Sequence, residues 1–151
     1  MPLVLQAILN QTTLPDKLIV FDDNDEPQDM RNEMIYQYFF QMLDIKKVKW
    51  EWLYANKKGQ HHIHQMANGM GFDWVWRCDD DAIPESNVLG NLLGYATAID
   101  NVGAVGGAIL TPPNIFYTSK TTGKIQDIDT EPNIQWNDIK KIKEVEHLHC
   151  S

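Results

Sequence analysis

Apolar and polar residues alternate along the first two thirds of the chain in runs whose periods predict strands and helices. Residues 17–21 form an apolar run that ends abruptly in acidic residues, which is typical of a buried strand entering a polar loop. Residues 48–54 place apolar side chains at alternate positions and predict a strand with one apolar face. Residues 28–45 contain no Gly or Pro, and a repeat at every fourth position predicts a helix. The repeating residues are Met30, Met34, Tyr38 and Met42.

The next stretch continues the alternation of helix and strand. Residues 59–70 are expected to be helical, and residues 73–78 to form a strand that runs directly into three aspartates. Pro84 suits the first turn of a further helix, which apolar residues 102–110 follow. The buried stripe expected on this helix consists of Val88, Leu92, Ala96 and Ile99. This order predicts an α/β fold with a mainly parallel sheet and helices on both faces, whose ligands bind beyond the carboxyl ends of the strands.

Turn-forming residues dominate the segment from residue 111 onward. Short strands are expected around residues 115–118, 125–128 and 134–136. Residues 138–151 fit a helical spacing and a strand alternation equally, so both readings stay open.

Length and composition support one folded domain. The 151 residues with 43% apolar content are sufficient for a hydrophobic core, so we predict a single domain over 1–151. Its two parts are 1–110, with the alternating elements, and 111–151. The 13 Lys and Arg against 21 Asp and Glu give a formal net charge of -8. This balance argues against nucleic acid and against an anionic membrane surface as partners.

Targeting signals and cysteine frameworks are not evident in the sequence. No apolar stretch approaches the about 18–20 residues of a membrane span, and the first residues lack the basic segment of a signal peptide. Cys78 and Cys150 lie far apart, without the spacing of a zinc site or a disulfide framework. A cytoplasmic location is therefore the default expectation.

The triplet Asp79-Asp80-Asp81 offers carboxylates at a predicted strand end. In an extended segment Asp79 and Asp81 point to one side, where they would suit Mg²⁺ or Mn²⁺ sharing phosphate oxygens. A solvated turn that caps the following helix is an equally good reading of the triplet alone.

A second acidic cluster, Asp22-Asp23-Asn24-Asp25, follows the strand predicted at 17–21. Carboxylates just past a strand can accept hydrogen bonds from a nucleoside, although a polar turn is the better reading of this cluster alone. An EF-hand loop is excluded, because Pro27 and Gln28 stand where an oxygen ligand and Gly are required.

The remaining chemical side chains are less specific. His61, His62 and His64 lie on a predicted helix without the i, i+4 spacing of a zinc protease, so a structural or surface role is expected. His149 would share a strand face with His147 and is a candidate metal ligand, beside the more usual structural role. We expect Cys78 to pack in the interior rather than to act as a nucleophile. We expect the tryptophans in general to belong to the core, although Trp136 could stack on a sugar ring.

Taken together, five segments in order resemble a family 2 glycosyltransferase of the GT-A fold. They are residues 7–15, similar to the family's SLLNQTYP; residues 18–23, similar to its IIVVDD strand; residues 56–59, similar to NKG; residues 74–85, similar to the strand with the DxD motif and its IPE sequel; and residues 102–107, similar to the next strand. The resemblance covers roughly residues 5–110.

The resemblance implies roles for the acidic residues. Asp22 and Asp23 would lie at the uracil or ribose of a nucleotide-sugar donor. Asp81 would be the main ligand of Mn²⁺ or Mg²⁺ bridging the diphosphate, with Asp79 as the other D of the motif, and Asp79 or Asp80 would reach the ribose or the sugar. The implied reaction is inverting transfer of the sugar to a saccharide or lipid-linked acceptor. Residues 1–110 would then bind the nucleotide sugar, and 111–151 would begin the acceptor side.

Three departures from the family pattern qualify these roles. The family's first strand and its PTYN turn are absent, so the chain is expected to be truncated at both ends, with a cleft or exposed strand edges. The family's Arg-Asn pair is replaced near His64-Gln65, which removes a cation expected beside the donor. The candidates for the catalytic base are Asp138, Glu144 and Glu146, with no motif to select among them.

A second hypothesis belongs to a different class. A GT-A-like fragment without activity would bind a nucleotide or a protein partner, or form a homodimer through the sheet edge left by the absent strand. If the chain acts on a lipid-linked acceptor, it is expected at the inner face of the membrane rather than across it.

Overall fold

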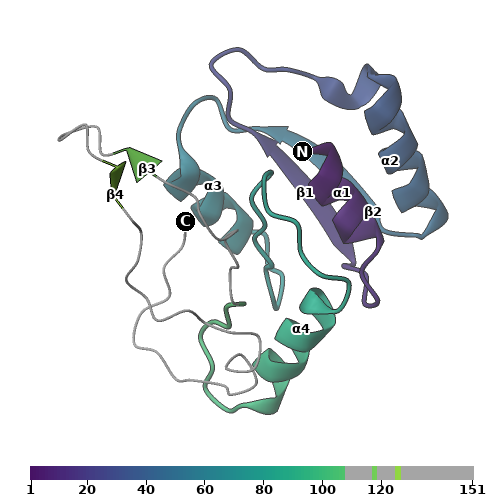
Figure 1. Ribbon diagram of the computed structural model, residues 1–151. Helices are drawn as coiled ribbons and strands as arrows, with labels where there is room; N and C mark the ends of the chain where they lie inside the picture. The colour runs from purple at the N-terminus through teal and green to yellow at the C-terminus, as the bar shows by residue number, and fades with distance from the viewer. Residues whose placement is uncertain (108–116, 119–124, 127–151) are drawn as a thin grey trace. The chain divides into compact units, whose positions relative to one another are not determined.

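The computed structural model describes residues 1–107, 117–118 and 125–126. Contacts divide the chain into two compact units, Met1–Val102 and Gly103–Ser151, and each is described by itself. The first unit contains, in chain order, α1 (Pro2–Leu9), β1 (Lys17–Asp22), the 3-10 helix η1 (Met30–Asn32), α2 (Met34–Ile45), β2 (Lys49–Tyr54), α3 (Gln60–Asn68) and α4 (Val88–Ala98) (Figure 1).

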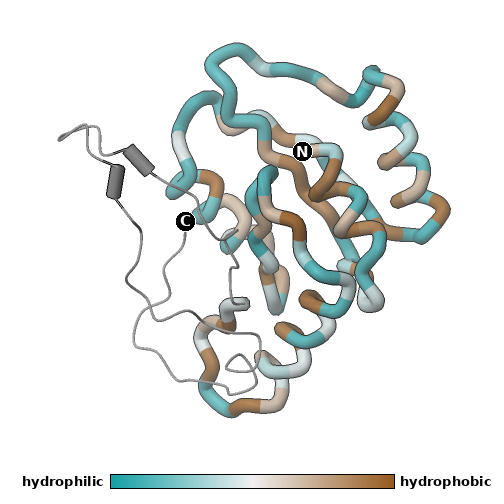
Figure 2. The backbone as a smooth tube through the Cα atoms, viewed as in Figure 1, coloured by the Kyte–Doolittle hydropathy of each residue, from teal (hydrophilic) through white to brown (hydrophobic). Residues whose placement is uncertain are grey.

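The two strands of the first unit confirm the predicted parallel sheet. β1 pairs with β2 in parallel, with Lys17 opposite Lys49 and Asp22 opposite Tyr54. The connection between them runs through α2, as parallel neighbours require a crossover. Both carboxyl ends therefore lie at the same edge of the sheet. Figure 2 shows that the loop following β1 at this edge is hydrophilic.

A hydrophobic core lies between the helices α1 and α2 and the strand pair. Phe40 of α2 stacks on Trp50 of β2 with ring centroids 4.2 Å apart and meets Trp52 edge to face. The alternation predicted for residues 48–54 is confirmed, since Val48 and Trp52 are buried. The core consists of Leu5, Leu9, Tyr36, Phe39, Phe40, Leu43, Val48 and Trp52.

The helix predicted over residues 28–45 is confirmed only for its second part, and its buried face differs from the repeating positions. Glu33 has an extended backbone and separates η1 from α2. Met34 and Tyr38 are 85% and 51% exposed. A residue repeated at every fourth position drifts around the helix by about 40° per step, so such a row leaves the buried face. The buried residues of α2 are Tyr36, Phe39, Phe40 and Leu43.

The prediction of a strand over residues 73–78 is wrong, as far as the described part of the chain shows. The segment has no strand assignment there, and Trp74 and Val75 are 42% and 37% exposed. The alternation survives locally, because Trp76 and Cys78 are half-buried while Arg77 is exposed. A strand also needs a hydrogen-bonded neighbour, and a local pattern carries no information about one.

The helix predicted from Pro84 begins four residues later, at Val88. The reason is a distant cap: the side chain of Gln11, buried at 5% exposure, accepts a hydrogen bond from the Leu89 amide at 3.0 Å. The first amides of a helix lack partners within the helix, so this contact fixes where α4 can start. The expected buried stripe is confirmed at Ala96 but is wrong at Ile99, which lies beyond α4 and is 43% exposed.

In the second unit, β3 (Tyr117–Thr118) pairs antiparallel with β4 (Ile125–Gln126). These short strands fall within the first two expected around residues 115–118 and 125–128. The strand expected at 134–136 and the tail 138–151 lie outside the described residues. Within the part of the chain that the structure describes, no helix has the length and apolar character needed to cross a bilayer.

Leu43, only 1% exposed, provides the test of this core. Leu43→Ala is expected to lower the free energy of unfolding by about 2–5 kcal/mol, because it removes buried methyl groups and leaves a cavity. Met34→Ala on the exposed side of the same helix should change it by less than about 0.5 kcal/mol. Urea unfolding of both variants measures the difference. Equal effects would show that α2 does not pack as described.

Candidate functional site

The first component of the site is Asp22, the last residue of β1. It is 6% exposed, and its carboxylate accepts hydrogen bonds from the Asn24 amide at 3.1 Å, the Asn24 side chain at 2.6 Å and the Gln28 amide at 2.7 Å. An aspartate that binds the amide two residues on forms a compact turn. Asp22 therefore shapes the loop that follows β1. The polar-turn reading of this cluster is confirmed for Asp22.

Asp23 joins this loop to the next one along the edge. Its two carboxylate oxygens accept hydrogen bonds from the backbone amides of Lys58 at 3.0 Å and Gly59 at 2.9 Å. These amides converge because the chain between β2 and α3 turns in the left-handed region, at Asn56, Lys57 and Gly59 with φ of 56°, 55° and 81°. Consecutive amides in such a turn form a concave anion site, which the protein's own carboxylate occupies here.

The triplet 79–81 differs from Asp22 and Asp23 in having free carboxylates. All three residues are exposed, and within the described part of the chain none of their side chains forms a hydrogen bond or ion pair that would occupy its oxygens. The Asp79 carbonyl accepts the Ala82 amide at 3.2 Å, so the triplet forms a turn. Mg²⁺ and Mn²⁺ prefer oxygen ligands such as carboxylates, so the chemistry of these side chains fits such an ion.

The geometry adds one condition to that fit. Among the described residues, no group of three or more His, Cys, Asp or Glu is arranged to hold a metal ion by itself. Mg²⁺ usually binds through one or two carboxylates and completes its shell with water and phosphate oxygens. The described residues by themselves therefore do not form a closed metal cage at the triplet.

Helix α3 and the turn before it contact Asp23 and Arg77, which lies two residues before the triplet. The helix start follows the Lys58 and Gly59 amides that Asp23 accepts. Farther along, His64 and Asn68 contact Arg77, which leads into the triplet. The Arg77 guanidinium lies 3.4 Å from His64 Nδ1 and donates to Asn68 Oδ1 at 3.0 Å. The nine residues of α3 extend about 13 Å, so Asp23 and Arg77 are held near the two ends of one short helix.

Sequence analysis did not identify three of these contacts. Gln11 and Arg77 lie within segments that resemble the family, but no role was expected for either side chain, and the Lys58 and Gly59 backbone amides have no side-chain signal. The one available signal was the Asn-Lys-Lys-Gly turn, whose Asn and Gly favour left-handed backbone. The Arg77 contact also places a cation beside His64, near the position where the resemblance described above implies that one is lost.

Two titratable groups near the triplet have shifted pKa values. Partial burial lowers the pKa of His64 from its ordinary value, and the charges of Arg77 and His61 lower it further. Burial raises the pKa of the Cys78 thiol, and the neighbouring Asp79 and Asp81 charges act in the same direction. A thiol with a raised pKa is a poor nucleophile, which supports the packing role expected for Cys78.

The candidates for the catalytic base lie outside the described residues. These are Asp138, Glu144 and Glu146, and the same holds for the possible metal ligand His149 and for Trp136. Their roles stay predictions.

A parallel strand pair with helical crossovers and a polar edge at the carboxyl ends defines an α/β protein of the kind that binds ligands at that edge. Comparison with known families is more specific. The family described as Glycosyl transferase family 2 matches residues 2–149, and the chain belongs to this family. No curated protein and no solved structure gives a significant match. The family assignment confirms the resemblance and supports a role in glycosyl transfer.

Asp23→Asn tests the link between the two loops. An asparagine amide nitrogen cannot accept from a backbone amide, so one hydrogen bond and the charge are lost. We expect the free energy of unfolding to fall by about 1–2 kcal/mol. The control is Asp25→Asn, which removes only the exposed ion pair with Lys57 and should cost about 0–0.5 kcal/mol. Urea unfolding compares the two, and similar losses would contradict the role assigned to Asp23.

The lowered pKa of His64 predicts a pH dependence of stability. Above about pH 6.5 the imidazole is neutral in both folded and unfolded chains. As pH falls below that value the unfolded chain takes up the proton first, so stability declines until the pH passes the folded pKa. His64→Gln should reduce this decline, measured by urea unfolding between about pH 7.5 and pH 5. An unchanged decline in His64→Gln would refute the assignment.

Proposed function

We propose that the protein transfers a sugar, with inversion, from a nucleotide-sugar donor, most simply a uridine diphosphate sugar, to a saccharide or lipid-linked acceptor. The observation that carries this proposal is the exposed acidic turn at 79–81, whose side chains have no partner among the described residues, together with the contacts that hold Asp23 near the start of α3 and Arg77 near its end. Family membership supports the general reaction, and these contacts support where on the chain the donor would bind.

Each acidic residue has a role in the proposal. Asp81, with Asp79, would hold Mn²⁺ or Mg²⁺, and Asp80 would accept a hydroxyl of the ribose or sugar. Asp22 and Asp23 would lie at the uracil or ribose, the half-buried Asp23 through its remaining lone pairs and the buried Asp22 through the loop that it holds. A divalent ion bound at the triplet would neutralise charge on the departing nucleoside diphosphate.

The remaining steps belong to side chains beyond the described region. A carboxylate must accept the proton of the attacking hydroxyl, and Asp138, Glu144 and Glu146 are the candidates. Arg77 lies two residues before the triplet in the sequence, and its hydrogen bond to Asn68 restrains its guanidinium. It therefore keeps a positive charge close to the acidic turn along the chain.

Asp81→Asn tests the donor and metal roles together. For the wild-type protein, a uridine diphosphate sugar in tenfold excess over its Kd, with Mn²⁺, should stabilise the fold by about 1.4 kcal/mol. This corresponds to a rise in Tm of about 3–6 °C for a chain of this size. Asp81→Asn should abolish the rise, and omitting the metal should do the same.

Asp73→Asn is the matched control, because Asp73 is exposed and lies outside the triplet. It should preserve the full rise. A panel of nucleotide sugars that leaves Tm unchanged, or a rise that survives in Asp81→Asn, would refute the proposed donor site.

A second candidate function is supported by the edges of the strand pair. Within the described residues β1 pairs only with β2, so each strand has one unpaired edge. Unpaired edges are templates for association, which favours a non-catalytic domain that dimerises or binds a partner. Light scattering distinguishes the two: a monomer that transfers sugar supports the transferase, and a dimer without ligand-dependent stabilisation supports the binding module.

A further inference from the structure

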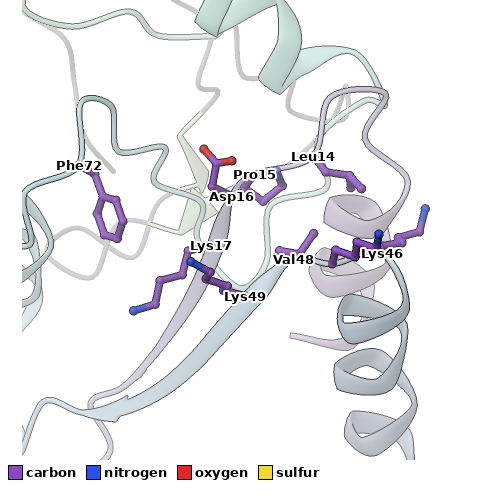
Figure 3. A pocket seen from close by; sticks show the side chains of 9 residues that line it. Leu14, Pro15, Asp16, Lys17, Lys46, Val48, Lys49 and Phe72 are labelled. Carbon is purple, nitrogen blue, oxygen red and sulfur yellow. The ribbon is translucent and has the colours of Figure 1, made fainter.

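A hollow of about 580 Å³ opens at the amino ends of β1 and β2. This is the opposite end of the strands from Asp22 and Asp23, so the hollow is separate from the candidate donor site. Its volume lies within the range of small-ligand pockets. It is lined by Leu14, Pro15, Asp16, Lys17, Lys46, Lys47, Val48, Lys49 and Phe72 (Figure 3).

The charge of this lining is opposite to that of the whole chain. Four of the nine lining residues are lysines and one is an aspartate, whereas the chain carries a formal net charge of -8. Four of the 13 Lys and Arg of the entire sequence therefore line one hollow. Such a concentration in an acidic protein is a specific local feature rather than a consequence of composition.

Two of the lysines lie directly opposite each other. Lys17 and Lys49 are register partners in the parallel pair, and Figure 3 shows their side chains leaving adjacent strand starts. Like charges at such positions repel each other. Glu51 offsets the charge of Lys17 through an ion pair of 2.6 Å. In the described part of the chain no ion pair is formed by Lys49.

The other two lysines come from the end of α2. Lys46 is the C-cap, and Lys47 follows it in the left-handed region with φ of 60°. Glycine is the usual residue at that position, because it adopts this backbone without strain. The negative end of the helix dipole favours a cation there. Lys46 and Lys47 also have no ion pair among the described residues, so their charges remain available to a ligand.

Apolar residues in the lining would strengthen the electrostatic attraction of the lysines for an anion. Val48 is only 3% exposed, and Leu14 and Pro15 add apolar surface beside it. Charges next to apolar surface are less well screened by water than charges on an open surface. Phe72, 43% exposed, also lines the hollow.

We propose that this hollow is a binding site for a phosphate-bearing anion. The Lys17, Lys46, Lys47 and Lys49 ammonium groups would supply its counter-charge without a metal ion. The ligand could be a free phosphorylated compound or the phosphate of an anionic lipid headgroup at a membrane surface, since both present the same chemistry. The site goes beyond the proposed transferase function and does not depend on it.

The experiment uses inorganic pyrophosphate and lipid vesicles as probes, both in the presence of EDTA. Chelation removes the divalent ion that the proposed donor site requires, so binding under these conditions reports on the hollow. Titration calorimetry measures pyrophosphate. Cosedimentation compares vesicles of phosphatidylcholine with vesicles that also contain phosphatidylglycerol. We expect saturable binding of at least one probe that weakens as salt is raised.

The variant Lys46→Gln/Lys47→Gln should weaken that binding at least tenfold. Its matched control is Lys57→Gln/Lys58→Gln, at the other end of β2. Both pairs are adjacent, and each contains one left-handed lysine, Lys47 with φ of 60° and Lys57 with φ of 55°. The control should bind as the wild type does.

A measurement on the wild-type chain tests the site even if the variants do not fold. Amine acylation followed by mass spectrometry should show that the bound probe protects Lys46, Lys47 and Lys49 but leaves Lys57 and Lys58 reactive. Pyrophosphate binding alone identifies a free phosphorylated ligand, and binding only to phosphatidylglycerol vesicles identifies a lipid surface. Binding of neither probe, equal weakening in the control, or no selective protection would each overturn the proposal. Loss of the Asp81-dependent Tm rise would not affect it.

Discussion

The buried carboxamide of Gln11 is the contact on which the arrangement of the candidate site depends. It donates to the carbonyls of Ala7 at 3.1 Å and Glu85 at 2.7 Å and accepts from the Leu89 amide at 3.0 Å. A buried amide must satisfy both its donor and its acceptor, so these bonds tie the end of α1 to the start of α4. Thr12 adds a second tie to Ser86 at 2.7 Å. The chain leaving the acidic triplet is thereby held to α1, while Arg77 holds the chain entering it to α3.

The parallel strand pair separates two regions of opposite charge. Carboxylates gather at the carboxyl ends, where Asp22 and Asp23 organise the adjoining loops, and lysines gather at the amino ends around Lys17 and Lys49. The strands separate Lys17 from Asp22 by five residue steps, which is about 17 Å. At that distance exposed charges are largely screened from each other at physiological salt. Charges at one end would therefore have little effect on a ligand proposed at the other.

Features set by local pattern were predicted well, and those set by distant contacts were not. The alternation in residues 48–54 identified β2 because one face packs on the core. Segment 73–78, which pairs with no strand among the described residues, has a similar alternation, but pairing depends on a neighbour that the pattern does not specify. Pro84 suggested a helix start by its own geometry, whereas the actual start depends on Gln11, 78 residues from Leu89. At the site, the acidic clusters were visible in the sequence, but the backbone amides of the left-handed loop were not.

The loop before α3 has a consequence for the chemistry that this end of the sheet can support. The amides of Lys58 and Gly59 already point at the carboxylate of Asp23. A glycine-containing turn at a helix start would otherwise be a natural cradle for phosphate oxygens. In this protein the Asp23 carboxylate already accepts hydrogen bonds from both amides, so they would not be available to the phosphate oxygens of an incoming diphosphate. It would have to obtain its electrostatic compensation from groups brought in beside the triplet instead.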